Sequence, residues 1–140
     1  MQLVTFEQEL VGRLNRSGQA QAKSYHELNA RWLFGTVVRT GDAEVAYRIT
    51  KGSGTGDPKP TEDEQALHAE YVTRAASGKA DPSSRGASAA AEKISALIRD
   101  VLAAEPLPGA VGVVGPGDSD KPGVKVVFNT DAEIYVRPVL

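Results

Sequence analysis

The chain of 140 residues contains no cysteine. This absence excludes a disulfide framework, a thiolate metal site and a cysteine nucleophile. The N-terminus lacks the basic start and apolar run of a secretory signal, and no stretch is apolar for long enough to span a membrane. An excess of one charge is also missing, because 16 basic residues face 18 acidic ones. We therefore expect a soluble, cytoplasmic protein without a global field that attracts nucleic acid or membranes.

Several motifs that carry chemistry are missing as well. No Gly-x-Ser-x-Gly sequence is present to form the nucleophile elbow of a hydrolase. The glycine-rich segment 52–56 stands between a predicted strand and a predicted helix, but its spacing fits neither the dinucleotide fingerprint nor the P-loop. The helix that follows opens with Glu62, Asp63 and Glu64, which would repel a phosphate. The sequence therefore predicts no nucleotide cofactor.

One pattern occurs twice. Residues 37–48 and 126–137 each contain two apolar residues, a turn, the tripeptide Asp-Ala-Glu, an aliphatic residue and an arginine. Turn-forming residues between runs of β-branched residues are typical of a β-hairpin, so two hairpins are predicted. Two predicted helices precede each copy, which leaves duplication open beside chance similarity.

Helical and extended patterns divide the rest of the chain. Apolar residues three and four apart predict four helices, and capping boxes mark the starts of three of them, at Thr5, Ser24 and Thr61. Alternating patterns predict strands at 32–39, 43–50, 110–114, 124–129 and 132–139. This order predicts a single α+β domain over residues 1–140, with a mainly antiparallel sheet of about five strands and about four helices packed on one face. Flexible loops are expected near 52–60, 78–86 and 115–123.

Charged residues occupy the polar sides of the two hairpins. Glu44 and Arg48 lie four residues apart on one strand, which separates them by about 13 Å, so they cannot share a ligand within that strand. The same holds for Glu133 and Arg137. Cross-strand pairs with Arg39 or Lys125 are the expected alternative. The predicted recognition face for a partner comprises Arg39, Glu44, Arg48, Glu133 and Arg137; a solvated face with weak ion pairs is the other interpretation.

His68 and Glu70 are the weak catalytic candidates that the sequence offers. They have the His-x-Glu spacing of zinc-dependent nucleoside deaminases, but that chemistry also needs a Pro-Cys-x-x-Cys pair. Zinc binding by His26 together with His68 would need further carboxylate ligands. Each histidine is therefore interpreted as an ordinary surface or half-buried residue, and neither a catalytic residue nor a metal site is assigned.

The leading hypothesis is a non-catalytic interaction or assembly module of bacterial type, which binds a protein partner or its own copy. An accessory, inhibitor, immunity-type or homo-oligomeric protein would fit, and the apolar run 134–140 is expected to form an edge strand for pairing. One alternative is a small-molecule binder or enzyme with a pocket near His68 and Glu70. The second is weak nucleic-acid binding through basic residues of the N-terminal half. These residues are Arg13, Arg16, Lys23, Arg31, Arg39, Arg48 and Lys51.

Overall fold

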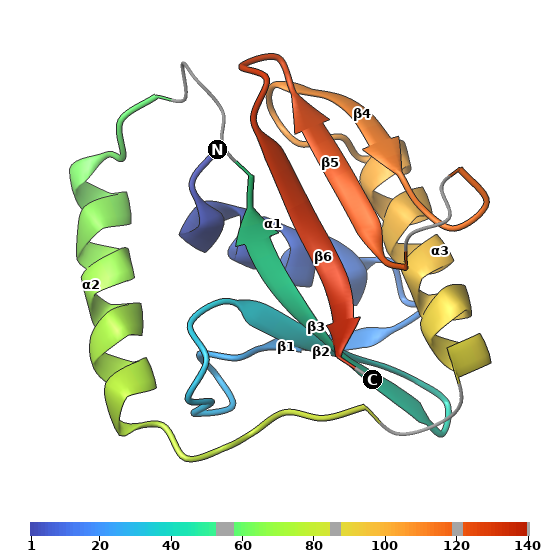
Figure 1. The fold of residues 1–140 in the computed structure, drawn as a ribbon, viewed down its shortest axis with the longest axis horizontal. Coiled ribbons are helices and arrows are strands. Elements are labelled where there is room, and N and C mark those ends of the chain that lie inside the picture. The colour runs from blue at the N-terminus through green and yellow to red at the C-terminus, as the bar shows by residue number, and fades with distance from the viewer. Residues whose placement is uncertain (53–57, 85–87, 119–121, 140) are drawn as a thin grey trace.

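The computed structural model describes residues 1–52, 58–84, 88–118 and 122–139, and within them the chain forms three helices and six strands (Figure 1). The predicted α+β class is confirmed, with one helix fewer and one strand more than expected. The elements in chain order are α1 (Leu3–Arg16), β1 (Gln21–Ser24), β2 (Gly35–Thr40), β3 (Ala43–Lys51), α2 (Glu62–Ser77), α3 (Ser88–Ala104), β4 (Ala110–Val114), β5 (Val124–Phe128) and β6 (Glu133–Val139). None of the described helices combines the length and apolar character that a membrane span requires.

The strands form one antiparallel sheet in the order β1-β2-β3-β6-β5-β4. Both predicted hairpins are present, as β2–β3 and β5–β6. The expectation of an edge strand at the C-terminal run is wrong, because β6 lies in the centre of the sheet between β3 and β5. The edges are β1 and β4, and β4 carries an irregularity in its register between Ala110 and Gly112, the kind of bulge that protects an edge from further pairing.

The helix predicted to start at Ser24 does not form. The capping contacts are present, since Ser24 Oγ accepts a hydrogen bond from the Glu27 N–H at 3.1 Å, but the chain turns only once. Asn29 has a φ of 54°, a left-handed conformation that ends a helical turn. Ser24 itself belongs to β1, a short polar strand that sequence periodicity did not reveal.

The core lies between one face of the sheet and the two helices α1 and α3. Their buried stripes pack against apolar side chains of β2, β3, β5 and β6. Tyr47 on β3 fixes α3 to the sheet: its buried hydroxyl donates to the carbonyl of Ala91 at 3.2 Å and lies 2.8 Å from Ser95 Oγ. The stripes comprise Phe6, Leu10 and Leu14 on α1 and Ile94, Ile98 and Leu102 on α3.

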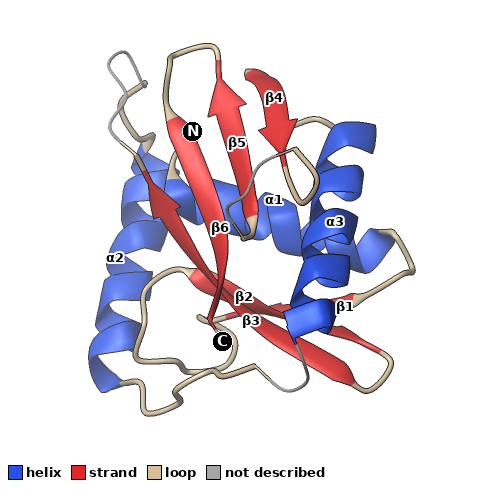
Figure 2. Cartoon of the chain, turned by 45° about the vertical axis from the view of Figure 1, so that its right-hand side comes forward, coloured by secondary structure: helices blue, strands red, loops and turns tan. Residues whose placement is uncertain are grey.

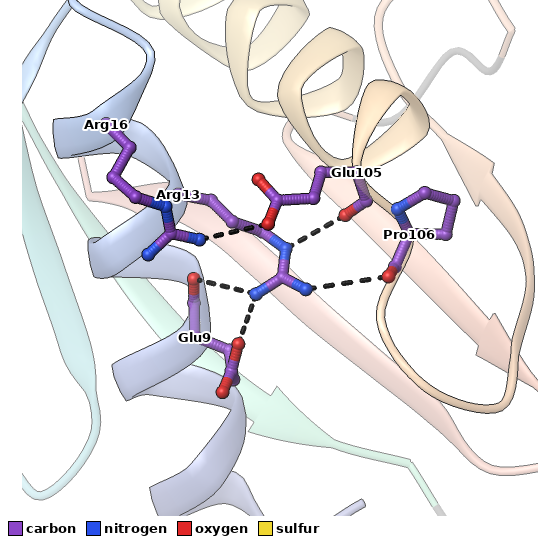
Figure 3. A network of polar contacts seen from close by, with 5 residues as sticks. All are labelled: Glu9, Arg13, Arg16, Glu105 and Pro106. Atoms are coloured by element: carbon purple, nitrogen blue, oxygen red, sulfur yellow. Dashed lines mark hydrogen bonds and ion pairs between the residues drawn. The ribbon is translucent and has the colours of Figure 1, made fainter.

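Arg13 connects α1 to the end of α3 (Figure 3). Its guanidinium is buried and donates from Nε to the Glu105 carbonyl at 2.8 Å, from Nη2 to the Pro106 carbonyl at 3.5 Å, and to the Glu9 carboxylate. Arg16 adds an exposed ion pair with Glu105 at 3.1 Å. Because Arg13 satisfies the carbonyls of the two residues that follow α3, it connects the chain after that helix to α1.

Helix α2 lies beside the sheet rather than on the face that α1 and α3 cover, which corrects the prediction of four helices on one face (Figure 2). Its predicted capping box between Thr61 and Glu64 is confirmed. Among the helix residues only Tyr71 is buried. Of the predicted flexible loops, residues 53–57, 85–86 and 119–121 lie outside the described residues. The described part 79–84 hydrogen-bonds back to the body, where Ser84 Oγ receives the Ala46 N–H at 3.0 Å.

The two halves of the chain are arranged about a local two-fold axis. Each half is a helix followed by three antiparallel strands, α1-β1-β2-β3 and α3-β4-β5-β6, and the halves meet where β3 pairs with β6. In that pair Arg48 lies directly opposite Arg137, the residue 89 positions later in the doubled motif. An antiparallel pair has its two-fold axis where equivalent residues face each other, so the axis passes between these arginines.

The burial pattern follows the same symmetry. The buried stripes of α1 and α3 lie 88 positions apart, and the buried polar residues Glu7 and Ser95 have the same spacing. The first hairpin turns through two residues and the second through three, Asn129 to Asp131. Because of this extra residue, equivalent residues are 88 positions apart before the turn and 89 positions apart after it. Val38 is therefore equivalent to Val126 in the structure, and not to Val127 as in the sequence alignment without a gap. The topology favours duplication over chance similarity.

Two glycines occupy equivalent places beside the axis. A Cβ on Gly35 would lie 2.4 Å from the carbonyl oxygen of Tyr47, and one on Gly123 would lie 2.3 Å from that of Val136. Tyr47 and Val136 immediately precede the two axial arginines. In each half, two backbone segments approach each other closely at this point. Only glycine, which has no Cβ, leaves enough space for this approach.

Gly123→Ala should lower the free energy of unfolding by about 2 kcal/mol, because Gly123 has a φ of 90° and an added Cβ would clash with backbone. Urea denaturation measures the change. Gly112→Ala is the matched control: it meets no atom within 4 Å, and a change within about 0.5 kcal/mol is expected. Equal effects of the two substitutions would contradict the close approach at Gly123.

Candidate interaction face

No helix of the described residues covers the face of the sheet opposite α1 and α3, and Figure 1 views the molecule from this side of β3, β6 and β5. We call it the open face. Side chains on a strand alternate between faces, and directly paired residues share a face. The register therefore assigns to the open face Gln21, Lys23, Val37, Arg39, Glu44, Ala46, Arg48, Thr50, Lys125, Val127, Glu133, Tyr135, Arg137 and Val139.

All five residues predicted as a recognition face lie together on the open face. Arg39 is directly opposite Glu44 between β2 and β3, and the Glu133 carboxylate lies 3.8 Å from Lys125 Nζ between β6 and β5. Arg48 and Arg137 face each other at the centre. The register thus brings together two charged hairpins that the sequence alone could not place relative to each other.

The two central arginines each contact an aromatic ring. The guanidinium carbon of Arg48 lies 4.3 Å from the ring centroid of Trp32, and that of Arg137 lies 4.5 Å from the ring centroid of Tyr135. Neither arginine makes an ion pair with a carboxylate in the described part of the chain. Two cations directly opposite each other on neighbouring strands repel, so this arrangement lowers stability and marks the position as unusual.

Trp32 extends the open face beyond the strands. It is 39% exposed, with Arg31 on its ring at 5.0 Å, and its Nε1 donates to Asp81 Oδ1 at 2.9 Å. Asp81 also accepts from Arg31 at 3.1 Å. The sequence pattern predicts a strand that begins at Trp32, whereas β2 begins at Gly35. The pattern gave no signal that Asp81, nearly fifty residues later, orients this ring.

A groove of about 380 Å³ runs between the open face and the segment 80–83. Gln21, Lys23, Arg39 and Glu44 line its sheet side, together with the apolar Val37 and Leu28. Ala30 and Ala80 form a parallel bridge that holds the segment in place. The groove makes the open face concave near β1. The centre of the open face, by contrast, is formed by residues of the strands.

The structure does not bring the catalytic candidates together. His68 lines a second groove, of about 410 Å³, with its ring 5.7 Å from that of Phe34. Glu70 instead points to His26, with Oε1 3.7 Å from Nε2, and does not line that groove. Within the described residues no group of three or more His, Asp or Glu side chains is placed to hold a metal ion.

The basic residues considered for nucleic-acid binding do not form one strip. Arg13 is buried against the end of α3 and Arg16 pairs with Glu105, both beneath the sheet, whereas Lys23, Arg39 and Arg48 lie on the open face. Glu44, Glu133 and Asp81 are interspersed among the cations of that face. This mixture of signs differs from the continuous basic surface of nucleic-acid-binding domains.

A buried glutamate lies where α2 meets the body. Glu7 on α1 is fully buried, and its Oε1 accepts the Gly35 N–H at 3.1 Å, while Oε2 has no hydrogen-bond partner among the described residues. Burial raises the pKa of Glu7 to about 7, although the Gly35 N–H and the nearby hydroxyl of Tyr71 act in the opposite direction. No sequence motif indicates this role of Glu7. Its spacing from Val4 and Val11, on the flank of the apolar stripe, was the available signal.

Two aromatic residues, Tyr71 and His26, form the rest of this contact between α2 and the body of the molecule. Tyr71 stacks on His26, with ring centroids 4.1 Å apart. Burial and the charge of Glu7 raise the pKa of Tyr71. The pKa of His26 is lowered by burial and by the charge of Arg74, whose Nη1 lies 3.2 Å from His26 Nε2. A neutral His26 and a protonated Tyr71 are therefore the forms that suit this contact near neutral pH.

Glu7→Gln should remove a pH dependence of stability. The folded pKa of about 7 exceeds the ordinary value of 4.5, so the neutral carboxyl is favoured by folding, fully so below pH 4.5 and no longer above pH 7. Relative to the variant, the wild type should lose roughly 3 kcal/mol of unfolding free energy across this window. Urea denaturation at several pH values measures the difference. The exposed Glu92→Gln serves as control, and equal pH profiles for the wild type and the Glu7 variant would contradict the assignment.

Comparisons with models of protein families, with curated proteins and with solved structures give no match for this chain. The function is therefore inferred from the geometry of the described residues. That geometry separates His68 from Glu70 and gathers charged and aromatic side chains on one uncovered face of the sheet.

Proposed function

We propose that the protein is a non-catalytic interaction module that binds a protein partner on the open face. The observation that carries the proposal is the uncovered sheet face with an exposed Trp32 and two arginines, Arg48 and Arg137, held against aromatic rings without described carboxylate partners. Tryptophan, tyrosine and arginine are the residues that dominate binding energy at protein interfaces.

The packing of the molecule supports this role for the open face. The opposite face is filled by α1 and α3, and its apolar side chains are buried. A sheet with one face on the core and one face in water is a common arrangement, but the water side then usually carries scattered polar residues. Here two arginines without an ion pair to a described carboxylate lie at the centre, each against an aromatic ring, and energetic anchors of interfaces cluster at the centre.

Site-specific photo-crosslinking tests the proposal. A photoreactive amino acid at Thr50, an exposed position opposite Tyr135 on the open face, should give a discrete covalent adduct in the cells that express the protein. The same amino acid at Glu92, exposed on α3, is the matched control and should give none. An excess of unlabelled wild-type protein should suppress the adduct, because the binding is saturable.

The mass of the adduct identifies the kind of partner. Twice the mass of the chain would indicate a second copy, and any other defined mass would indicate a different protein. Equal crosslinking from Thr50 and Glu92, or no saturable adduct from Thr50, would overturn the proposed function.

A further inference from the structure

The two-fold arrangement gives the open face a defined centre. Arg48 and Arg137 pair directly across β3 and β6, and directly opposite residues of an antiparallel pair have Cβ atoms about 5 Å apart. The two arginine side chains therefore leave the backbone at equivalent positions on either side of the local axis. Trp32 supports one guanidinium and Tyr135 supports the other, at nearly equal distances of 4.3 and 4.5 Å.

The acidic side chains of the open face are engaged elsewhere. Glu133 accepts from the Tyr135 hydroxyl and lies 3.8 Å from Lys125 Nζ. Asp81 accepts from Trp32 and Arg31. Glu44 stands opposite Arg39 in the register. No described carboxylate forms an ion pair with Arg48 or Arg137. The five N–H groups of each guanidinium can therefore bind acceptors of a partner.

We propose that the Arg48–Arg137 pair is a recognition site for two carboxylates of an acidic segment in the partner protein. This inference deepens the proposed function and rests on it. A guanidinium binds a carboxylate through two parallel hydrogen bonds, so two arginines at paired strand positions can bind two carboxylates of one segment. Acidic residues at positions i and i+2 of an extended segment point to the same side, so they supply this pair.

The occupant follows from charge complementarity and from the stacking of the arginines. A doubly acidic segment removes the repulsion between the two cations, which no described residue of the chain neutralises. Rings that hold the guanidinium planes also reduce the side-chain freedom lost on binding. A single inorganic anion is attracted by the same two cations, but it does not carry two separate carboxylates to match the two arginines. Inorganic phosphate is therefore the ligand with which the peptide is compared in the test.

Trp32 supplies a direct readout, because it is the only tryptophan of the chain and touches Arg48. The probe is a short synthetic peptide with two glutamates separated by one neutral residue. It should change the Trp32 fluorescence saturably, with a sub-millimolar dissociation constant that weakens as salt is added. The same peptide with glutamines should bind at least roughly tenfold more weakly, since it lacks the charge-assisted hydrogen bonds.

Substitutions at the axis test the residues themselves. Arg137→Gln leaves the contact between Arg48 and Trp32 in place, and it should weaken the glutamate peptide by roughly tenfold or more. Arg48→Gln, followed by calorimetry because it alters the surroundings of Trp32, should do the same. Arg16→Gln is the matched control, since Arg16 is an exposed, ion-paired arginine on α1. Urea denaturation verifies that the variants fold, and removal of a like charge should leave them at least as stable as the wild type.

Three results would overturn the inference: no saturable response to the glutamate peptide, phosphate binding as tight as peptide binding, or unchanged peptide affinity in both axial variants. The crosslink at Thr50 separates this failure from that of the proposed function. If the adduct persists in the Arg48→Gln and Arg137→Gln variants, the open face is an interface, but the axial arginines are not its recognition site.

Discussion

The pairing of β3 with β6 is the interaction on which the rest of the structure depends. It joins two three-stranded halves into one sheet, from Ala46 opposite Val139 to Lys51 opposite Ile134. It also places the core sides of both halves in one plane, so α1 and α3 share a single apolar face. Without this pairing, each half would expose a long central strand edge and half of a hydrophobic core.

The same pairing creates the charged centre of the open face. Each half carries an arginine at the equivalent position, and the antiparallel register sets the two side by side. The repulsion between them is a cost that the fold sustains through the rest of its packing, with the aromatic contacts of Trp32 and Tyr135 as partial compensation. Residues retained in a locally unfavourable arrangement are where function is sought first, because stability alone does not account for them.

Sequence reasoning predicted the parts of the fold that depend on local signals. The hairpins were recognised from their turns and from alternation, and α2 from its capping box. Pairing between distant strands has no comparable local signal, so the central position of β6 was missed. β1 was missed because a strand of four residues, three of them polar, shows too little periodicity. The helix predicted at Ser24 shows the opposite case, where a correct local signal is overridden by the left-handed Asn29.

For the candidate site, the sequence identified the five charged residues but not their neighbours. Arg39, Glu44, Arg48, Glu133 and Arg137 share a face because side chains alternate along strands, a rule that sequence reasoning can apply. Trp32, Asp81 and Glu7 were not identified, because their roles come from contacts between distant segments. Such contacts depend on how the irregular segment 25–34 is folded, and irregular segments have no period.

Because the two halves belong to one chain, the surroundings of the two arginines can differ. In a symmetric pair of separate chains, any substitution would appear at both equivalent positions. In one chain the two halves can diverge, and here one arginine stacks on a tryptophan from the segment after β1 while the other stacks on a tyrosine from its own strand. A nearly symmetric framework thus presents a directional surface, on which a bound segment has a distinguishable head and tail.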